Sequence, residues 1–211
     1  MVLLALDTST PLVSVALHDD GRVIDAATSE QPMKHGEQLA PMIAAALGRV
    51  GAIRQDVTAV AAGVGPGPFT GLRVGLVTAR TLGLALDIPV YGACSLDVLA
   101  LRAVDHGVAE PFLATIDARR KELFWASYDE EGRRVDGPHV DRPGELPDLL
   151  VAGAGPVLYP GEFGRTAGPE GPDAATLAMA VAEERLELMD PEPIYLRRPD
   201  ATVPGPPKKV S

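Results

Sequence analysis

Short apolar runs separated by turn residues organise the start of the chain. Residues 2–6 and 12–18 are apolar, and Asp19, Asp20 and Gly21 form a turn signal before a third run at residues 22–28. We expect these runs to form a three-stranded meander. Two further apolar runs, at residues 57–64 and 89–93, are typical of buried strands.

Longer segments with apolar residues three and four positions apart predict helices between these strands. This spacing covers residues 35–50, 72–86 and 96–104, and a later helix is expected at 174–188. Strands that alternate with helices imply a mixed sheet covered by helices, and therefore an α/β fold.

An internal repeat suggests two related lobes. Residues 3–21 and 113–132 share the same order of apolar strand, Asp, polar turn, apolar strand, acidic turn and Gly, so that Asp7 corresponds to Asp117. The alternative is that two unrelated hairpins look alike. With the repeat, the chain divides into lobes at 1–107 and 108–198 and a tail at 199–211, which is expected to be disordered. Residues 132–173 are dense in Gly, Pro and charge, so the second lobe is expected to be truncated.

Charge and cysteine content narrow the classes of function. The 211 residues carry a net charge of -10, which argues against unaided nucleic-acid binding and would require a basic partner for any RNA role. A single cysteine, Cys94, excludes an internal disulfide and fits a reducing compartment, so the cytoplasm is expected. No apolar run is long enough to span a bilayer, and the apolar start ends at Asp7, which favours a strand over a signal peptide.

A glycine-rich stretch at residues 63–71 is the obvious candidate for a phosphate loop. A P-loop needs Lys and Ser or Thr directly after its last glycine, whereas Gly71 is followed by Leu72 and Arg73. Pro66 and Pro68 also remove two backbone donors. The pattern favours a rigid turn before the next helix, with phosphate binding as the less favoured alternative.

The helices predicted at 35–50 and 72–86 are apolar nearly all round, which predicts a surface that packs against a partner. In the second of them, small residues recur every four positions and could form a groove for another helix, at a cost of about 1 kcal/mol for each interior glycine relative to alanine. The alternative is that both helices are fully covered within their own lobe. The predicted partner interface comprises Leu39, Ile43, Ala46, Leu72, Gly75, Leu76, Ala79, Leu82 and Gly83.

Candidates for catalysis are few. The four histidines are scattered without metal-ligand spacing, and we expect them to be ordinary surface or loop residues. Asp7, Thr8 and Ser9 could face a metal-bound nucleotide, although a turn between strands explains the same residues. Arg119 and Arg120 could bind an anion or a partner carboxylate, or form a solvated hairpin tip.

Several segments together resemble the TsaB family, which serves the bacterial synthesis of threonylcarbamoyladenosine in tRNA. The resemblance covers nearly the whole chain and is carried by LALDTSTPLVSVAL, HGEQLAPMI, GVGPGPFTGLRVGLVTARTLGLAL, IPVYGACSLDVLA, IDARRKELFWASY and PIYLRRPDA. It implies the actin-like ATPase fold of two duplicated lobes. The family is a non-catalytic relative of TsaD, which transfers the threonylcarbamoyl group to N6 of adenosine 37. The two metal-binding histidines of TsaD correspond here to Ser95 and Leu99, so the resemblance implies no metal site.

The resemblance also implies a function and partners. The chain is expected to be a scaffold, not an enzyme on its own, that binds a TsaD-like catalytic subunit and acts with a TsaE-like ATPase on tRNAs reading codons that begin with A. ATP is then used by the complex, with a nucleotide at the subunit junction and no tightly bound cofactor in this chain. A homodimer is expected in isolation, tRNA is contacted only through the complex, and DNA and membranes are not partners. The rival is an active actin-fold kinase or ATPase in which Asp7 positions magnesium.

Overall fold

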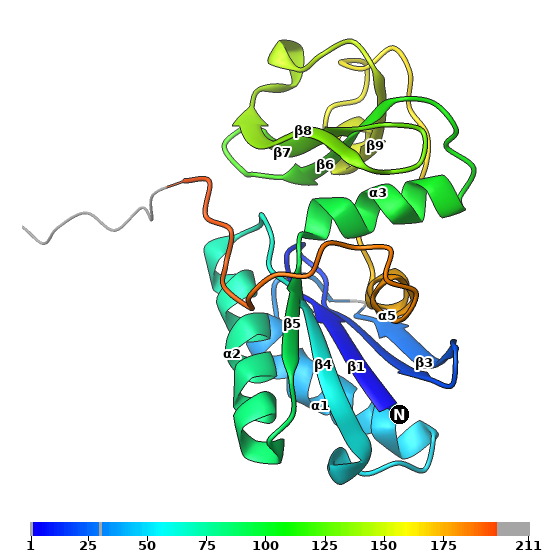
Figure 1. The fold of residues 1–211 in the computed structure, drawn as a ribbon. Coiled ribbons are helices and arrows are strands. Elements are labelled where there is room, and N and C mark those ends of the chain that lie inside the picture. The colour runs from blue at the N-terminus through cyan, green and yellow to red at the C-terminus, as the bar shows by residue number, and fades with distance from the viewer. Residues whose placement is uncertain (1, 30, 198–211) are drawn as a thin grey trace, which may run out of the picture.

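The first of two lobes is built on a five-stranded mixed sheet (Figure 1). The computed structural model describes residues 2–29 and 31–197. The strand order is β3-β2-β1-β4-β5, in which β1–β3 form the predicted antiparallel meander and β4 and β5 run parallel to β1. The strands are β1 Val2–Asp7, β2 Ser14–Asp19, β3 Arg22–Thr28, β4 Val57–Gly63 and β5 Val90–Ala93.

The second lobe repeats this layout with one strand fewer. Its order is β8-β7-β6-β9, again an antiparallel meander followed by a parallel strand. At the end of the first strand of each lobe, Asp7 and Asp117 accept a 2.7 Å hydrogen bond from the backbone N–H two residues on. The predicted repeat is therefore confirmed in both topology and local geometry. The strands are β6 Phe112–Asp117, β7 Leu123–Tyr128, β8 Arg134–Asp141 and β9 Leu150–Gly153.

Helices cover both faces of the first sheet and separate the lobes (Figure 1). α1 and α2 pack on one face, α5 packs on the other, and α3 lies between the two sheets. None of the helices in the described ranges is long and apolar enough to cross a membrane. The helices are α1 His35–Arg49, α2 Phe69–Leu86, α3 Ser95–Asp105, α4 Ala154–Leu158 and α5 Ala174–Ala182, with short 3-10 turns at Arg54–Asp56 and Pro143–Glu145.

Helix α5 returns the chain to the first lobe. Its residues Leu177 and Ala178 share a buried cluster with Ala5 of β1 and Ala16 of β2. The small side chains on both surfaces let helix and sheet approach closely. The predicted division placed this helix in the lobe 108–198, which the packing corrects, because hydrophobic periodicity does not reveal which sheet a helix covers. The predicted tail at 199–211 lies outside the described residues.

A C-terminal strap, residues 187–197, runs along both lobes (Figure 1). Met189 pairs with Gly92 beside β5, and the Ile194 N–H donates to the Val64 carbonyl at 2.9 Å. Farther on, Arg197 Nη1 donates to the Ala118 carbonyl at 2.8 Å. Met189 and Ile194 also pack against the cores of both lobes. The strap thus ties the lobes together over and above α3.

Candidate functional site

The Asp7 carboxylate is enclosed by groups of its own chain. Asp7 is 2% exposed; its Oδ1 accepts the Ser9 N–H at 2.7 Å and the Ser9 hydroxyl at 2.6 Å, and its Oδ2 accepts the Ser95 hydroxyl at 2.7 Å. Burial raises the pKa of the Asp7 carboxyl above its ordinary value, and the hydrogen bonds from Ser9 and Ser95 oppose that rise. A Cβ added at Gly63 would lie 1.9 Å from Oδ2, so the loop wraps the carboxylate closely.

This geometry gives the three candidate polar residues a structural role. Thr8 and Ser9 are fully buried, and the Thr8 hydroxyl donates to the Gly71 carbonyl at 2.8 Å. Asp7 therefore links β1 to the start of α3, and Thr8 links it to the start of α2. The oxygens of all three residues make hydrogen bonds within the chain, as expected for the turn that was the alternative interpretation. Ser95, at the first position of α3, completes the cluster.

The glycine-rich loop at residues 63–71 packs against Ser9 and Ser95 of the same cluster. A Cβ at Gly67 would lie 2.4 Å from the Ser9 carbonyl oxygen, and the Gly65 N–H donates to the Ser95 hydroxyl at 3.2 Å. The loop therefore uses its glycines to pack against the turn after β1. This favours the rigid-turn interpretation over phosphate binding.

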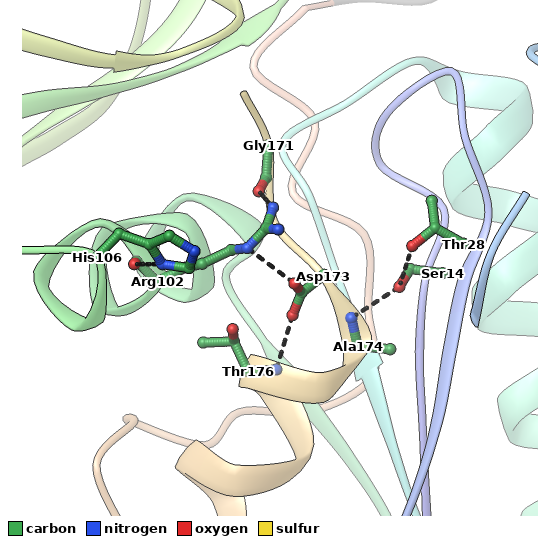
Figure 2. A network of polar contacts seen from close by, with 8 residues as sticks. All are labelled: Ser14, Thr28, Arg102, His106, Gly171, Asp173, Ala174 and Thr176. Atoms are coloured by element: carbon green, nitrogen blue, oxygen red, sulfur yellow. Dashed lines mark hydrogen bonds and ion pairs between the residues drawn. The ribbon is translucent and has the colours of Figure 1, made fainter. Parts of the chain in front are cut away.

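A cleft of about 930 Å³ opens between the lobes beside Asp7. Its wall is largely apolar, and its volume lies in the range of small-molecule sites. At one end, a polar network joins α3, the segment before α5 and the first sheet (Figure 2). The lining includes Pro11, Leu12, Ile116, Val157, Pro169 and Pro172, with Asp117, Glu170 and Asp173 as carboxylates and Arg102 and His106 as basic side chains.

The network in Figure 2 pairs the Arg102 cation with a carboxylate and caps helix α5. Arg102 donates through Nη1 to the Gly171 carbonyl at 2.6 Å and forms an ion pair through Nε with Asp173 Oδ2 at 2.8 Å, without an aligned hydrogen bond. Asp173 caps α5 by accepting the Thr176 N–H at 2.7 Å, and the Ser14 hydroxyl accepts the Ala174 N–H at 2.9 Å. The Arg102 cation is thus already compensated, so it holds α5 in place instead of offering a free anion site.

Two of the four histidines differ from expectation. His18 is 7% exposed in β2 with no hydrogen-bond partner for Nε2, and His35 is 5% exposed with Nε2 2.7 Å from the Thr10 carbonyl oxygen. Both side chains are therefore buried and are not the surface or loop residues that the sequence predicted. Across residues 2–29 and 31–197, no three His, Cys, Asp or Glu side chains gather in a way that could hold a metal ion.

The predicted partner interface lies mostly inside the first lobe. Eight of its nine residues are buried, and Leu82 is partly buried. A Cβ at Gly75 would lie 2.3 Å from Thr8 Oγ1, and one at Gly83 would lie 2.3 Å from Val90 Cγ2. The small-residue row of α2 therefore receives the lobe's own sheet, which corrects the choice of interface residues. The buried eight are Leu39, Ile43, Ala46, Leu72, Gly75, Leu76, Ala79 and Gly83.

The exposed sides of α1 and α2, opposite the buried residues of the predicted interface, carry apolar and small side chains. On α2, Val77 is 63% exposed and Leu84 is 87% exposed. On α1, a second row of small residues recurs every four positions and faces away from the core. The predicted interface took its α1 residues from the buried side instead, although the spacing of this row is visible in the sequence; the row comprises Gly36, Ala40, Ala44 and Gly48. We call these two exposed sides together the outer helix face.

Two duplicated lobes with mixed sheets and covering helices define an α/β protein of the actin-like ATPase type. The model of the family "TsaD: tRNA N6-adenosine threonylcarbamoyltransferase" matches residues 27–178. The chain therefore belongs to the TsaD family, and it is a TsaB-like member of it.

Relatives and solved structures agree with this assignment. An uncharacterized protein of Mycobacterium tuberculosis H37Rv is 39% identical over 206 residues, covering 94% of this chain and 92% of that protein. The Escherichia coli K12 tRNA threonylcarbamoyladenosine biosynthesis protein TsaB is 40% identical over 134 residues, covering 63% of this chain and 58% of its own length. The solved structure of YeaZ from Pseudomonas aeruginosa is 32% identical with a TM-score of 0.77, covering 92% of this chain and 99% of that chain.

Proposed function

We propose that this chain is a non-catalytic scaffold in the threonylcarbamoylation of N6 of adenosine 37 in tRNA. In this role it binds a TsaD-like catalytic subunit in the cytoplasm and works with a TsaE-like ATPase. ATP is consumed by the assembly, with a nucleotide at the subunit junction, and tRNA is contacted within the complex. Family membership and the relatives named TsaB support the pathway.

The observation that carries the scaffold role is the outer helix face. Leu84 exposes 87% of its surface, which removes it from any role in the lobe's own core. Val77 lies seven residues earlier, two helical turns away on the same side of α2. The small residues of α1 would let a partner helix approach closely beside this apolar row. An exposed apolar face of this kind is typical of a protein interface.

The C-terminal strap shapes one border of this face. A hollow of about 660 Å³ lies between α2 and the strap, lined by residues that include Val77, Leu84 and Tyr195. Arg80 Nη1 pairs with Glu192 Oε1 at 2.7 Å, and the rings of Phe69 and Tyr195 lie 4.9 Å apart, which holds the strap against α2. A partner side chain can therefore enter a pre-formed apolar recess with a polar rim.

The enclosed Asp7 cluster supports a non-catalytic role. Both carboxylate oxygens accept hydrogen bonds from the chain itself, so the local structure accounts for Asp7 without a magnesium ion. This counts against the rival kinase or ATPase. Calorimetry of the isolated protein with ATP and magnesium tests the rival directly, because tight binding with turnover would overturn the scaffold proposal.

The decisive variant is Leu84→Glu, which puts a charge on the most exposed large apolar side chain of the outer helix face. We expect affinity for the catalytic subunit to fall by roughly thirtyfold, the effect of losing a contact of about 2 kcal/mol. Val135→Glu is the matched control, because Val135 is 71% exposed but lies on β8 of the second lobe. Titration calorimetry gives the affinities, and the modified nucleoside in tRNA reports activity. Wild-type affinity in Leu84→Glu would refute the proposed face.

Self-association is tested with the same variants. We propose that the isolated chain dimerises through the outer helix face, so Leu84→Glu should yield a monomer where wild type and Val135→Glu yield a dimer. Sedimentation velocity distinguishes the two. A dimer that persists in Leu84→Glu would place the homodimer contact on another surface.

A further inference from the structure

The exposed row of α2 contains two arginines as well as Val77 and Leu84. Arg73, Val77, Arg80 and Leu84 follow one another every three or four residues, which keeps them on one side of the helix. All four are exposed. The helix contains no Asp or Glu, although the whole chain carries a net charge of -10. The α2 side of the outer helix face is therefore cationic.

The two arginines differ in the groups that hold them. Arg80 is neutralised by the strap, because its Nη1 donates to Glu192 Oε1 at 2.7 Å. The guanidinium carbon of Arg73 lies 3.7 Å from the centroid of the Phe69 ring, which is a cation–π contact. Within residues 2–29 and 31–197, the Arg73 guanidinium makes no ion pair and donates no hydrogen bond. Its charge is thus held in position without a carboxylate beside it.

The surroundings of Arg73 prepare it to bind an anion. Arg73, Arg80 and Glu192 are the charged residues that line the recess of about 660 Å³ between α2 and the strap, which leaves an excess of one positive charge there. The Phe69 ring under Arg73 also packs on Tyr195 of the strap, with centroids 4.9 Å apart. A guanidinium held on a fixed ring loses little conformational entropy when a carboxylate binds it.

A second copy of this chain offers Arg73 little that is complementary. A two-fold dimer places the same surface on both sides of the contact, so α2 packed on α2 would bring cations toward cations. The exposed side of α1 carries one carboxylate, Glu37, which already pairs with Lys34 at 3.9 Å. Arg73 therefore favours a partner of different sequence, one with a carboxylate on the helix that faces α2.

We infer that Arg73 selects an acidic helix of the catalytic subunit over a second copy of this chain. The inference rests on the proposed function and names the chemistry that the outer helix face recognises. A carboxylate of the partner helix pairs with the Arg73 guanidinium, and an apolar side chain of the same helix enters the recess beside Leu84. Arg73 and Leu84 lie about 16 Å apart along α2, so the partner helix runs along about three turns of it. Charge pairs at an interface decide which partner binds.

The test changes the charge at residue 73 and follows both associations. Arg73→Gln removes the charge, and Arg73→Lys keeps it on a side chain of similar length. Arg142→Gln is the matched control, because Arg142 is an exposed arginine of the second lobe. Titration calorimetry measures affinity for the catalytic subunit at about 50 and about 300 mM NaCl. Sedimentation equilibrium measures dimerisation of the isolated chain.

The two associations should respond differently. We expect Arg73→Gln to bind the catalytic subunit roughly tenfold more weakly at low salt and to lose much of the salt dependence of wild type, because salt screens an ion pair. Arg73→Lys should retain more affinity than Arg73→Gln. Dimerisation of Arg73→Gln should be unchanged or tighter, because a like charge has been removed. Arg142→Gln should match wild type in both measurements.

Three results would overturn the inference. The first is wild-type affinity of Arg73→Gln for the catalytic subunit. The second is an equal weakening of both associations, which would assign Arg73 to the general packing of the face. The third is a loss in Arg73→Lys as large as that in Arg73→Gln, because the charge would then not be the feature that the partner binds.

The proposed function fails separately from this inference. If the wild-type chain does not bind the catalytic subunit, the scaffold role is wrong whatever residue 73 does. If Leu84→Glu abolishes binding and Arg73→Gln leaves it unchanged, the outer helix face is correct and only the acidic partner helix is wrong.

Discussion

Gly75→Ala should destabilise the protein although it adds a better helix former. The new Cβ would lie 2.3 Å from Thr8 Oγ1 and 3.3 Å from Leu6 Cδ1, whereas ordinary contacts begin near 3.4 Å. Either α2 moves away from β1 by about 1 Å or the Thr8 hydroxyl turns away from the Gly71 carbonyl, to which it donates at 2.8 Å.

The expected magnitude follows from three contributions. Alanine gains about 1 kcal/mol in helix propensity over glycine. Overpacking of the core costs about 1–3 kcal/mol, and a buried hydrogen-bonding group left without a partner costs about 1–3 kcal/mol. We therefore expect a net loss of about 2 kcal/mol in the free energy of unfolding, equivalent to a fall in Tm of roughly 4–8 °C for a chain of this length.

Gly48→Ala is the matched control for this prediction. Gly48 is also helical, near the end of α1, but no atom lies within 4 Å of its added Cβ, so the variant should gain about 0.5 kcal/mol. Urea unfolding followed by circular dichroism at low protein concentration measures both. If Gly75→Ala were as stable as Gly48→Ala, the small-residue row of α2 would not face the sheet, and the packing of this helix would have to be reassigned.

Two further predictions concern buried ionisable groups. Burial raises the pKa of the Asp7 carboxyl above 3.8, which means that the folded protein favours the protonated form. The stability that this preference contributes is fully present below pH 3.8 and is lost as pH rises through the raised pKa. The free energy of unfolding of wild type relative to Asp7→Asn should accordingly decrease from pH 4 to pH 7, and a constant difference in urea unfolding would contradict this. Burial also raises the pKa of the Cys94 thiol to about 12, so about one thiol in ten thousand is ionised at pH 8. Reaction of the single cysteine with a disulfide reagent should follow unfolding, and rapid labelling of the native protein would disprove its burial.

Periodicity predicted the elements of the first lobe well. The expected helices at 35–50 and 96–104 correspond to α1 His35–Arg49 and α3 Ser95–Asp105. The helix expected to reach residue 188 ends at Ala182, because the chain turns at Glu184, whose φ is 56°. Local pattern thus predicts where helices lie, whereas a single left-handed residue decides where one ends.

The orientation of α2 could not be read from its pattern. The helix is apolar on nearly every side, so periodicity alone does not select a buried face. The sheet selects it, because Thr8 and Val90 come so close that only small residues fit opposite them, which leaves Leu84 outside. Likewise, the spacing of residues along the chain did not indicate that the Ser95 hydroxyl, 88 residues away, would donate a hydrogen bond to the Asp7 carboxylate.

The return of helix α5 to the first sheet sets the order in which this chain can be completed during synthesis. The last strand of the first sheet, β5, is complete once Ala93 has been synthesised. The helix that covers the second face of this sheet begins at Ala174, about 80 residues later. At a synthesis rate of roughly 5–20 residues per second, the second face of the sheet remains uncovered for about 4–16 s. During that interval Ala5, Ala16 and Ala61 have no helix over them, so the nascent first lobe exposes a smooth alanine-rich sheet to the ribosome surface and to chaperones.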